Sequence, residues 1–276
     1  MDAPEVGPDL KSKKLKGKNL ILLILVELWL VPSQALSFCH EIEVVEGGIV
    51  RVATGTPGSL LIEWFGHSTF QITSSKGTRI LTDPHIANDL PWPTLPHHIV
   101  TTSHQHAPHS NIWMAKGSPM VLEGLTPGGE NWRPIHAGVR DVSVYTVPAF
   151  HDKSQGLQRG KNAIFVFRVD DVCIAHLGDL GHSLTPAQLK MLGKIDVLLV
   201  PLAGGVYTIT ASEAREVTKQ VNPRIAIPMH YWWEEAVETY TQGHNRVRHI
   251  NSRLFQVSKR ELPEPTEIVV LSWNHR

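Results

Sequence analysis

Three histidines lie within six residues of one another in the stretch VTTSHQHAPHSN (100–111). They are His104, His106 and His109, and histidine is the commonest metal ligand in proteins. The chain holds 16 histidines in 276 residues, and this high count also points to metal chemistry. Pro108, directly before the third histidine, offers neither a side-chain oxygen nor a backbone N–H. The cluster therefore predicts a metal site with a proline in an unexpected place.

Other candidate ligands follow apolar stretches, at the point where each predicted strand ends. A sheet fixes side chains at such positions, and the repetition of this placement carries more weight than any one residue. The residues are His104 and His106 after HIVTTS (98–103), His151 after VSVYTVPAF (142–150), Asp179 after VCIAHLG (172–178) and His230 after RIAIPM (224–229).

This set of residue types favours hydrolysis. Imidazole suits zinc, manganese and iron, while a carboxylate such as Asp179 can bridge two cations. Water shared by two such ions loses a proton near neutral pH and becomes a nucleophile. We therefore expect one or two Zn²⁺ ions, with Mn²⁺ or Fe²⁺ as alternatives.

The elements that must position these residues form a series of short strands followed by strands that alternate with helices. This order predicts an α/β fold in which two sheets pack together with helices outside, as one domain over residues 40–276. Capping residues mark two helices, at Thr185 with Pro186 and at Thr210 with Glu213. The predicted strands are 59–65, 69–73, 78–83, 98–103, 142–150, 162–169, 172–178, 196–204 and 224–229, and the predicted helices are 185–192, 210–221 and about 245–257.

Residues 1–35 have the features of a targeting segment. Five lysines in KSKKLKGK (11–18) precede the apolar run LILLILVELWLV (20–31), which is too short to span a bilayer core as a helix. Small residues before a cleavage point after Ala35 predict a secretory signal peptide, with a membrane anchor or a buried helix as alternatives. We expect an exported protein, periplasmic or extracellular, or one associated with a membrane through residues 20–31.

The two cysteines and the charge balance set further limits. Cys39 and Cys173 allow at most one disulfide, and Cys173 lies in an apolar run where it is interpreted as a small buried hydrophobic residue. Lysine plus arginine equals aspartate plus glutamate at 26 each. Because no net charge attracts the chain to nucleic acid, we expect a small-molecule or lipid substrate.

Eight stretches, in order, resemble the metallo-β-lactamase fold hydrolases, most closely the broad subgroup that includes the ascorbate-phosphate lactonase-like proteins. The resemblance covers residues 58–232 and implies an αββα sandwich with a metal centre at one edge of the two sheets. The stretches are IEWFGHSTFQI (62–72), ILTDP (80–84), TSHQHAPHSN (102–111), VPAFHD (147–152), RGKNAIFVF (159–167), HLGDLGH (176–182), DVLLVPLAGG (196–205) and IPMHY (227–231).

The resemblance also implies a role for each candidate residue. His104, His106 and His151 would hold the first metal, Asp179 would bridge, and His109 and His230 would hold the second metal. The motif HxHxDH reads HQHAPH here, so Pro108 stands where the family has an aspartate. A mononuclear enzyme, a dinuclear enzyme with a substitute ligand, and a domain that has lost catalysis are the three outcomes left open.

Two more residues acquire roles by the same resemblance. Asp83 would orient a ligating histidine, with a plain turn residue before Pro84 as the alternative. His67, in the FGHSTF turn, would act catalytically by contacting substrate or a transition-state oxyanion, with a turn histidine bonded to backbone as the alternative.

The activity implied is that of a metal-dependent hydrolase. In it, a metal-activated hydroxide attacks an ester, lactone, amide or phosphodiester. Two alternatives stay open: a phospholipase that cleaves N-acylated phospholipids, whose domain opens with a similar WxGH motif, and a non-catalytic metal-binding domain with a degenerate second site. A β-lactam substrate is not expected, because the resemblance is to the general hydrolase subgroup.

Overall fold

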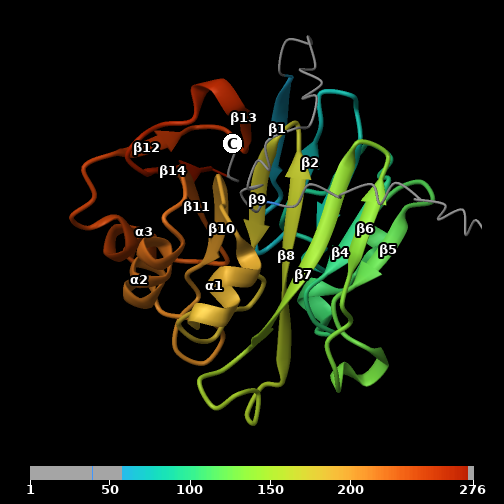
Figure 1. Ribbon diagram of the computed structural model, residues 1–276, viewed down its shortest axis with the longest axis horizontal. Coiled ribbons are helices and arrows are strands. Elements are labelled where there is room, and N and C mark those ends of the chain that lie inside the picture. The colour runs from blue at the N-terminus through green and yellow to red at the C-terminus, as the bar shows by residue number, and fades with distance from the viewer. Residues whose placement is uncertain (1–38, 40–57, 273–276) are drawn as a thin grey trace, which may run out of the picture. The chain divides into compact units, whose positions relative to one another are not determined.

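The computed structural model describes Cys39 and residues 58–272, which form two mixed β-sheets packed face to face (Figure 1). The predicted α/β sandwich is confirmed. The six-stranded sheet runs in the order β13 (Leu254–Ser258), β1 (Ser59–Trp64), β2 (Phe70–Thr73), β3 (Arg79–Thr82), β4 (Ile99–Thr102) and β5 (Met120–Glu123). The eight-stranded sheet runs in the order β12 (Val247–Ile250), β14 (Glu267–Leu271), β11 (Ile225–Met229), β10 (Val197–Pro201), β9 (Val172–His176), β8 (Lys161–Val169), β7 (Val142–Phe150) and β6 (His136–Val139).

The core between the sheets follows from the alternation of residues along the strands. In β1, every second residue is buried, and these residues are Leu60, Ile62 and Trp64. They face Phe165 and Phe167 of β8 across the interface. Replacing such a buried aromatic residue with alanine costs about 3 to 5 kcal/mol, so this layer fixes how the two sheets sit against each other.

Three α-helices cover the outer face of the eight-stranded sheet (Figure 1). Strands β9, β10 and β11 are buried along their whole length because the core lies on one side and the helices on the other. The outer face of the six-stranded sheet carries a smaller cluster, in which Met114 of a short 3-10 helix packs on Leu81 and Val100. The helices are α1 (Pro186–Leu192), α2 (Ala211–Val221) and α3 (Glu234–Thr241).

Both predicted helix caps are present. The Thr185 hydroxyl accepts the backbone N–H of Gln188, and the Thr210 hydroxyl accepts that of Glu213, which completes a capping box at each helix. The predicted helix at about 245–257 is wrong. That segment holds β12 and β13, and in β13 the burial alternates with a period of two, as in a strand with one face on the core.

The interpretation of Cys173 as an unbonded hydrophobic residue is also wrong. Cys173 is buried in β9, but it forms a disulfide with Cys39, with a Cα–Cα distance of 5.9 Å. The carbonyl oxygen of Cys39 also accepts the backbone N–H of Lys194 at 2.6 Å. The disulfide therefore attaches the chain at Cys39 to the eight-stranded sheet, beside the start of β10.

The predicted targeting segment, residues 1–35, lies outside the described residues. None of the helices within residues 58–272 has the length and apolar character needed to cross a membrane.

Reduction of the disulfide should lower stability. The bond joins residues 134 positions apart, and a crosslink of such a long loop restricts the unfolded chain, which stabilises the fold by about 3 kcal/mol. Cys173→Ser should therefore lower the Tm by about 10 °C in a thermal unfolding experiment. Cys39→Ser should have the same effect, and reductant should lower the Tm of the parent alone. An unchanged Tm in reductant would contradict the crosslink.

Candidate metal centre

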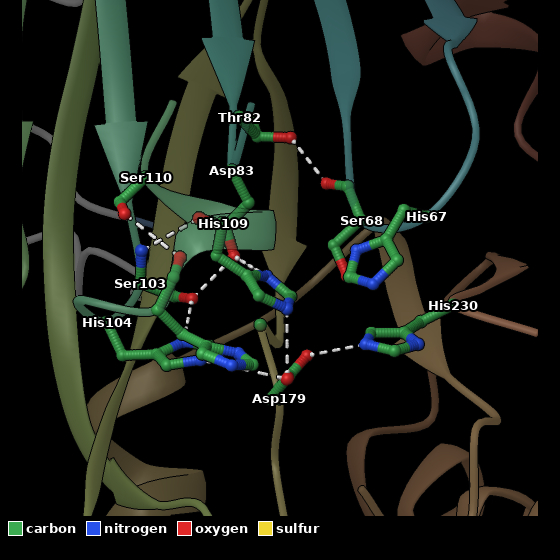
Figure 2. A network of polar contacts seen from close by, with 12 residues as sticks. His67, Ser68, Thr82, Asp83, Ser103, His104, His109, Ser110, Asp179 and His230 are labelled. Atoms are coloured by element: carbon green, nitrogen blue, oxygen red, sulfur yellow. Dashed lines mark hydrogen bonds and ion pairs between the residues drawn. The ribbon is translucent and has the colours of Figure 1, made fainter. Parts of the chain in front are cut away.

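Asp179 lies beside four buried imidazoles, of which Figure 2 labels His104, His109 and His230. It directly follows the β9 end of the eight-stranded sheet and is 2% exposed. The four distances from its carboxylate to histidine Nε2 atoms are 3.0 Å for His109, 3.1 Å for His151, 3.3 Å for His230 and 3.7 Å for His104. Its oxygen Oδ1 faces His230, whereas Oδ2 faces the other three rings. Both oxygens of the carboxylate thus face imidazole nitrogens, and the carboxylate lies between His230 on one side and the other three rings on the other.

Three overlapping groups of side chains can each hold a cation. Within every group the candidate ligand atoms lie no more than 4.8 Å from one another. The groups are His104 with His151 and Asp179, His104 with His106 and His109, and His67 with His109 and His230. The structure therefore brings together all six predicted ligands and adds His67 to them. Their role as ligands remains a prediction.

Strand ends and close backbone contacts position these ligands. Asn162 of β8 accepts the backbone N–H of Asp179 through Oδ1, at 3.1 Å, and donates through Nδ2 to the carbonyl oxygen of Leu177, at 2.9 Å. Gly181 lies so close to His151 that a Cβ atom at position 181 would come within 2.3 Å of the His151 carbonyl carbon. The loops that carry Asp179 and His151 are thus packed backbone to backbone, which only glycine permits.

Asp83 orients His109 from behind. Oδ2 of Asp83 accepts the His109 Nδ1–H at 3.1 Å, and this bond leaves Nε2 of that ring free to bind a metal. Ser103 holds the carboxylate in place, since its backbone N–H donates to Oδ1 at 2.7 Å and its hydroxyl donates to Oδ2 at 2.5 Å. Asp83 is fully buried, and its side chain holds a predicted ligand, His109, through this hydrogen bond. A plain turn residue would not make that contact.

His67 and His230 are joined through the backbone as well as through their rings. The carbonyl oxygen of His67 accepts the backbone N–H of His230 and the Trp64 Nε1–H, both at 3.0 Å. The two imidazole rings lie 3.8 Å apart between centroids. Both residues, like Asp83, have a positive φ, at 50° for His67 and 52° for His230. Such a conformation costs energy for residues other than glycine and is concentrated at functional sites.

The electrostatics of the centre depend on its two carboxylates. Burial raises the pKa of Asp179, but His109 and His230 outweigh this and hold it well below its ordinary value. Burial lowers the pKa of His109, but Asp179 and Asp83 outweigh this and raise it to about 10. Burial, together with His230 and His109, lowers the pKa of His67, which keeps that ring neutral. Asp179 thus carries the negative charge in the middle of the group.

The residues fit a metal ion. Nδ1 of His67 and Nε2 of His104 are buried and make no hydrogen bond within the described part of the chain. Nε2 of His109 lies 3.0 Å from Oδ2 of Asp179, and Nε2 of His230 lies 3.3 Å from Oδ1. Buried polar atoms in proteins are almost always satisfied, so a set of unsatisfied nitrogen and oxygen atoms that face one another is typical of ligands.

Pro108 lies in a short 3-10 helix (Ala107–His109) whose turn carries His109 into the group. The proline ring offers no ligand atom, so a cation beside His109 and His230 would depend on imidazoles and Asp179 alone. His106, by contrast with the other ligands, is exposed, with its ring 5.8 Å from that of His104 between centroids.

The sequence predicts His67 as a catalytic residue at this centre but not as a possible ligand, because nothing local indicates that the turn after β1 meets the end of β11. Asp152 is a contributor that sequence reasoning misses: its carboxylate accepts four backbone N–H groups of the loop that follows His151. An acidic residue directly after a predicted ligand in VPAFHD (147–152) was the available indication.

Comparison with known proteins agrees with this geometry. The chain is 30% identical over 194 residues to a UPF0173 metal-dependent hydrolase of Pyrobaculum neutrophilum, a match that covers 62% of this chain and 83% of the relative. A UPF0173 metal-dependent hydrolase of Thermococcus onnurineus is 31% identical over 192 residues and is covered to 84%.

Solved structures similar to this chain also include a protein of the metallo-β-lactamase superfamily. A Thermotoga maritima protein of the metallo-β-lactamase superfamily, for which zinc-dependent hydrolysis has been suggested, superposes with a TM-score of 0.62 at 34% identity, covering 77% of this chain and 98% of the other. A Parabacteroides distasonis protein shares the fold, with a TM-score of 0.58 at 16% identity over 78% of this chain and 94% of the other. The model of the beta-lactamase superfamily domain matches residues 61–230, which include most strands of both sheets and the whole group of predicted ligands, and the chain therefore belongs to that superfamily.

Proposed function

We propose that this chain is a metal-dependent hydrolase whose centre holds two cations, of which Zn²⁺ is the first candidate. One observation carries the proposal: the Asp179 carboxylate lies within 3.7 Å of imidazole nitrogens from both proposed groups, with Oδ1 toward His230 and Oδ2 toward His104, His109 and His151. The UPF0173 relatives are named metal-dependent hydrolases, and their likeness to this chain supports the same general activity here.

In this proposal the two cations divide the ligands between them. His104, His106 and His151 hold the first ion, while His109 and His230 hold the second and Asp179 bridges. His67 completes the second group, because its ring lies with those of His109 and His230 and its buried Nδ1 makes no hydrogen bond within residues 58–272. The neutral imidazole of His67 thus takes the place of the aspartate that the family has at position 108.

The bound cations would supply Lewis acidity and lower the pKa of water, which makes hydrolysis of an ester, lactone, amide or phosphodiester feasible at neutral pH. The protein's own groups prepare this chemistry. Asp83 accepts the Nδ1–H of His109 and so presents Nε2 to the ion. Asp179 and Asp83 raise the pKa of His109, so a cation at Nε2 would compete with a proton on this ring.

A lipid substrate is the second candidate, favoured by exposed aromatic residues beside His230. The Trp232 ring lies 5.1 Å from the His230 ring and 6.1 Å from the Tyr207 ring, between centroids, and Trp233 is 72% exposed. Exposed aromatic side chains next to a polar centre suit an apolar substrate portion. Comparing the rates for N-acylated phospholipid vesicles and for soluble esters would separate the two candidates.

Export or membrane association through residues 20–31 remains part of the proposal. The Cys39–Cys173 disulfide favours it, because such bonds persist in oxidising compartments.

Metal content tests the proposal directly. Elemental analysis of the purified chain should give two ions per molecule, and His104→Ala and His230→Ala should each lose one because each removes a ligand of a different ion. Hydrolysis of a soluble ester should fall by about 100-fold or more in both. His249→Ala, a surface histidine on β12, is the control and should keep both ions. A parent that binds no metal would refute the enzyme assignment.

The role of His67 has its own test. His67→Ala and His67→Phe should each lose one ion, because both remove the ring nitrogens while phenylalanine keeps a ring against His230. With Co²⁺ in place of Zn²⁺, the visible absorption spectrum should report the same loss. Retention of both ions in the two variants would return His67 to the role of a residue that contacts substrate.

Pro108→Asp distinguishes a working centre from a decayed one. We expect the ion count to stay at two and the hydrolysis rate to change by less than about tenfold, because His67 already supplies the missing ligand. A gain of an ion, or a much larger gain in rate, would instead favour the non-catalytic domain with a degenerate second site.

A further inference from the structure

The loop between β7 and β8 is organised by one buried carboxylate. Asp152 accepts the backbone N–H groups of Ser154 at 2.7 Å and Gly156 at 3.0 Å on Oδ1, and those of Gln158 at 3.1 Å and Arg159 at 2.8 Å on Oδ2. Burial raises the pKa of Asp152, but these four amides outweigh it and leave the pKa below its ordinary value. The loop is therefore a preformed turn built on an ionised side chain.

This turn places two positively charged side chains next to the candidate metal centre. The backbone N–H of His151 donates to the carbonyl oxygen of Gly160 at 3.1 Å, so the residues on either side of Gly160 lie beside a predicted metal ligand. Those residues are Arg159 and Lys161. Both side chains line one pocket of about 340 Å³ together with His104, His106 and His151.

Nothing in the described residues neutralises these two cations. No carboxylate lines the pocket, and neither Arg159 nor Lys161 forms an ion pair within residues 58–272. Aromatic rings hold them instead: Lys161 Nζ lies 5.0 Å from the centroid of the Trp132 ring, and Arg159 Cζ lies 5.5 Å from that of Tyr207. Lys153, on the same loop but not in the pocket, is by contrast paired with Glu213.

The platform under Lys161 is itself fixed. Trp132 Nε1–H donates to the carbonyl oxygens of Ala149 and Asn162, at 2.9 Å each. The ring therefore cannot swing away without breaking hydrogen bonds to β7 and β8. Arg159 and Lys161 thus form no ion pair within residues 58–272, rest on aromatic rings and line the same pocket as three of the predicted metal ligands.

We propose that Arg159 and Lys161 form a subsite for an anionic oxygen group of the substrate, a phosphate or a carboxylate, beside the His104, His106 and His151 ligands. This inference rests on the proposed hydrolase function and names the substrate class that the centre accepts. The fork of the Arg159 guanidinium suits either anion, since both offer two oxygens in one plane.

Equilibrium binding tests the subsite without requiring turnover. The metal-loaded full chain is titrated by calorimetry with phenylphosphonate, benzoate and neutral benzyl alcohol. Arg159→Ala and Lys161→Ala should each weaken binding of the preferred anion by about 10-fold or more, because each removes a charge-assisted hydrogen bond. The larger loss for phenylphosphonate would identify a phosphate, and the larger loss for benzoate a carboxylate.

Lys153→Ala is the matched control, because it removes a cation from the same loop but outside the pocket, and it should bind both anions as the parent does. Arg159→Lys should recover part of the binding. Anions that bind the parent no tighter than benzyl alcohol, or variants that all bind like Lys153→Ala, would overturn the subsite. Metal content measured on the same samples separates this failure from that of the hydrolase proposal, because a parent without bound ions would refute the hydrolase as well.

Discussion

The structure depends on a single buried carboxylate, Asp179, that draws imidazoles from both sheets to one point. His104 and His109 come from the end of β4 in the six-stranded sheet, whereas His151 and His230 come from β7 and β11 in the eight-stranded sheet. A buried charge is costly unless it is surrounded by opposite charge or hydrogen-bond donors, and a metal ion meets that need better than imidazole alone. The centre therefore joins the two sheets at one edge, while the apolar core joins them elsewhere.

The strands that end at this centre could be predicted because their information is local. Strand β7 has the predicted bounds, 142–150, since most residues of VSVYTVPAF are β-branched or aromatic and turn residues flank the stretch. The caps at Thr185 and Thr210 are equally local, because they need only residues three positions apart. The order of strand ends then places the ligands near one another without any knowledge of the tertiary contacts.

What could not be predicted depends on contacts between distant parts of the chain. The segment 245–257 has a polar, helix-compatible composition, but the edge of each sheet recruits part of it as β12 and β13. His67 meets His230 only because the β1–β2 turn lies against the end of β11. Cys39 and Cys173, likewise, are visible in the sequence, but the sequence does not predict that they lie close enough in space to form a disulfide. Tertiary context overrides local preference at each of these places.

The way Asp152 holds its loop has a consequence for how this protein can diversify. The carboxylate binds main-chain N–H groups only, so it places no demand on most side chains from Ser154 to Gln158, although proline is excluded where an N–H is donated. Gly156 is the exception, because its φ is 82° and a Cβ atom there would lie 2.8 Å from the Gly160 carbonyl oxygen. Side chains at the mouth of the centre can therefore be exchanged while the loop keeps its shape and His151 its position. Descendants of such a chain could acquire new substrates by changes in these few positions, with the metal chemistry left intact.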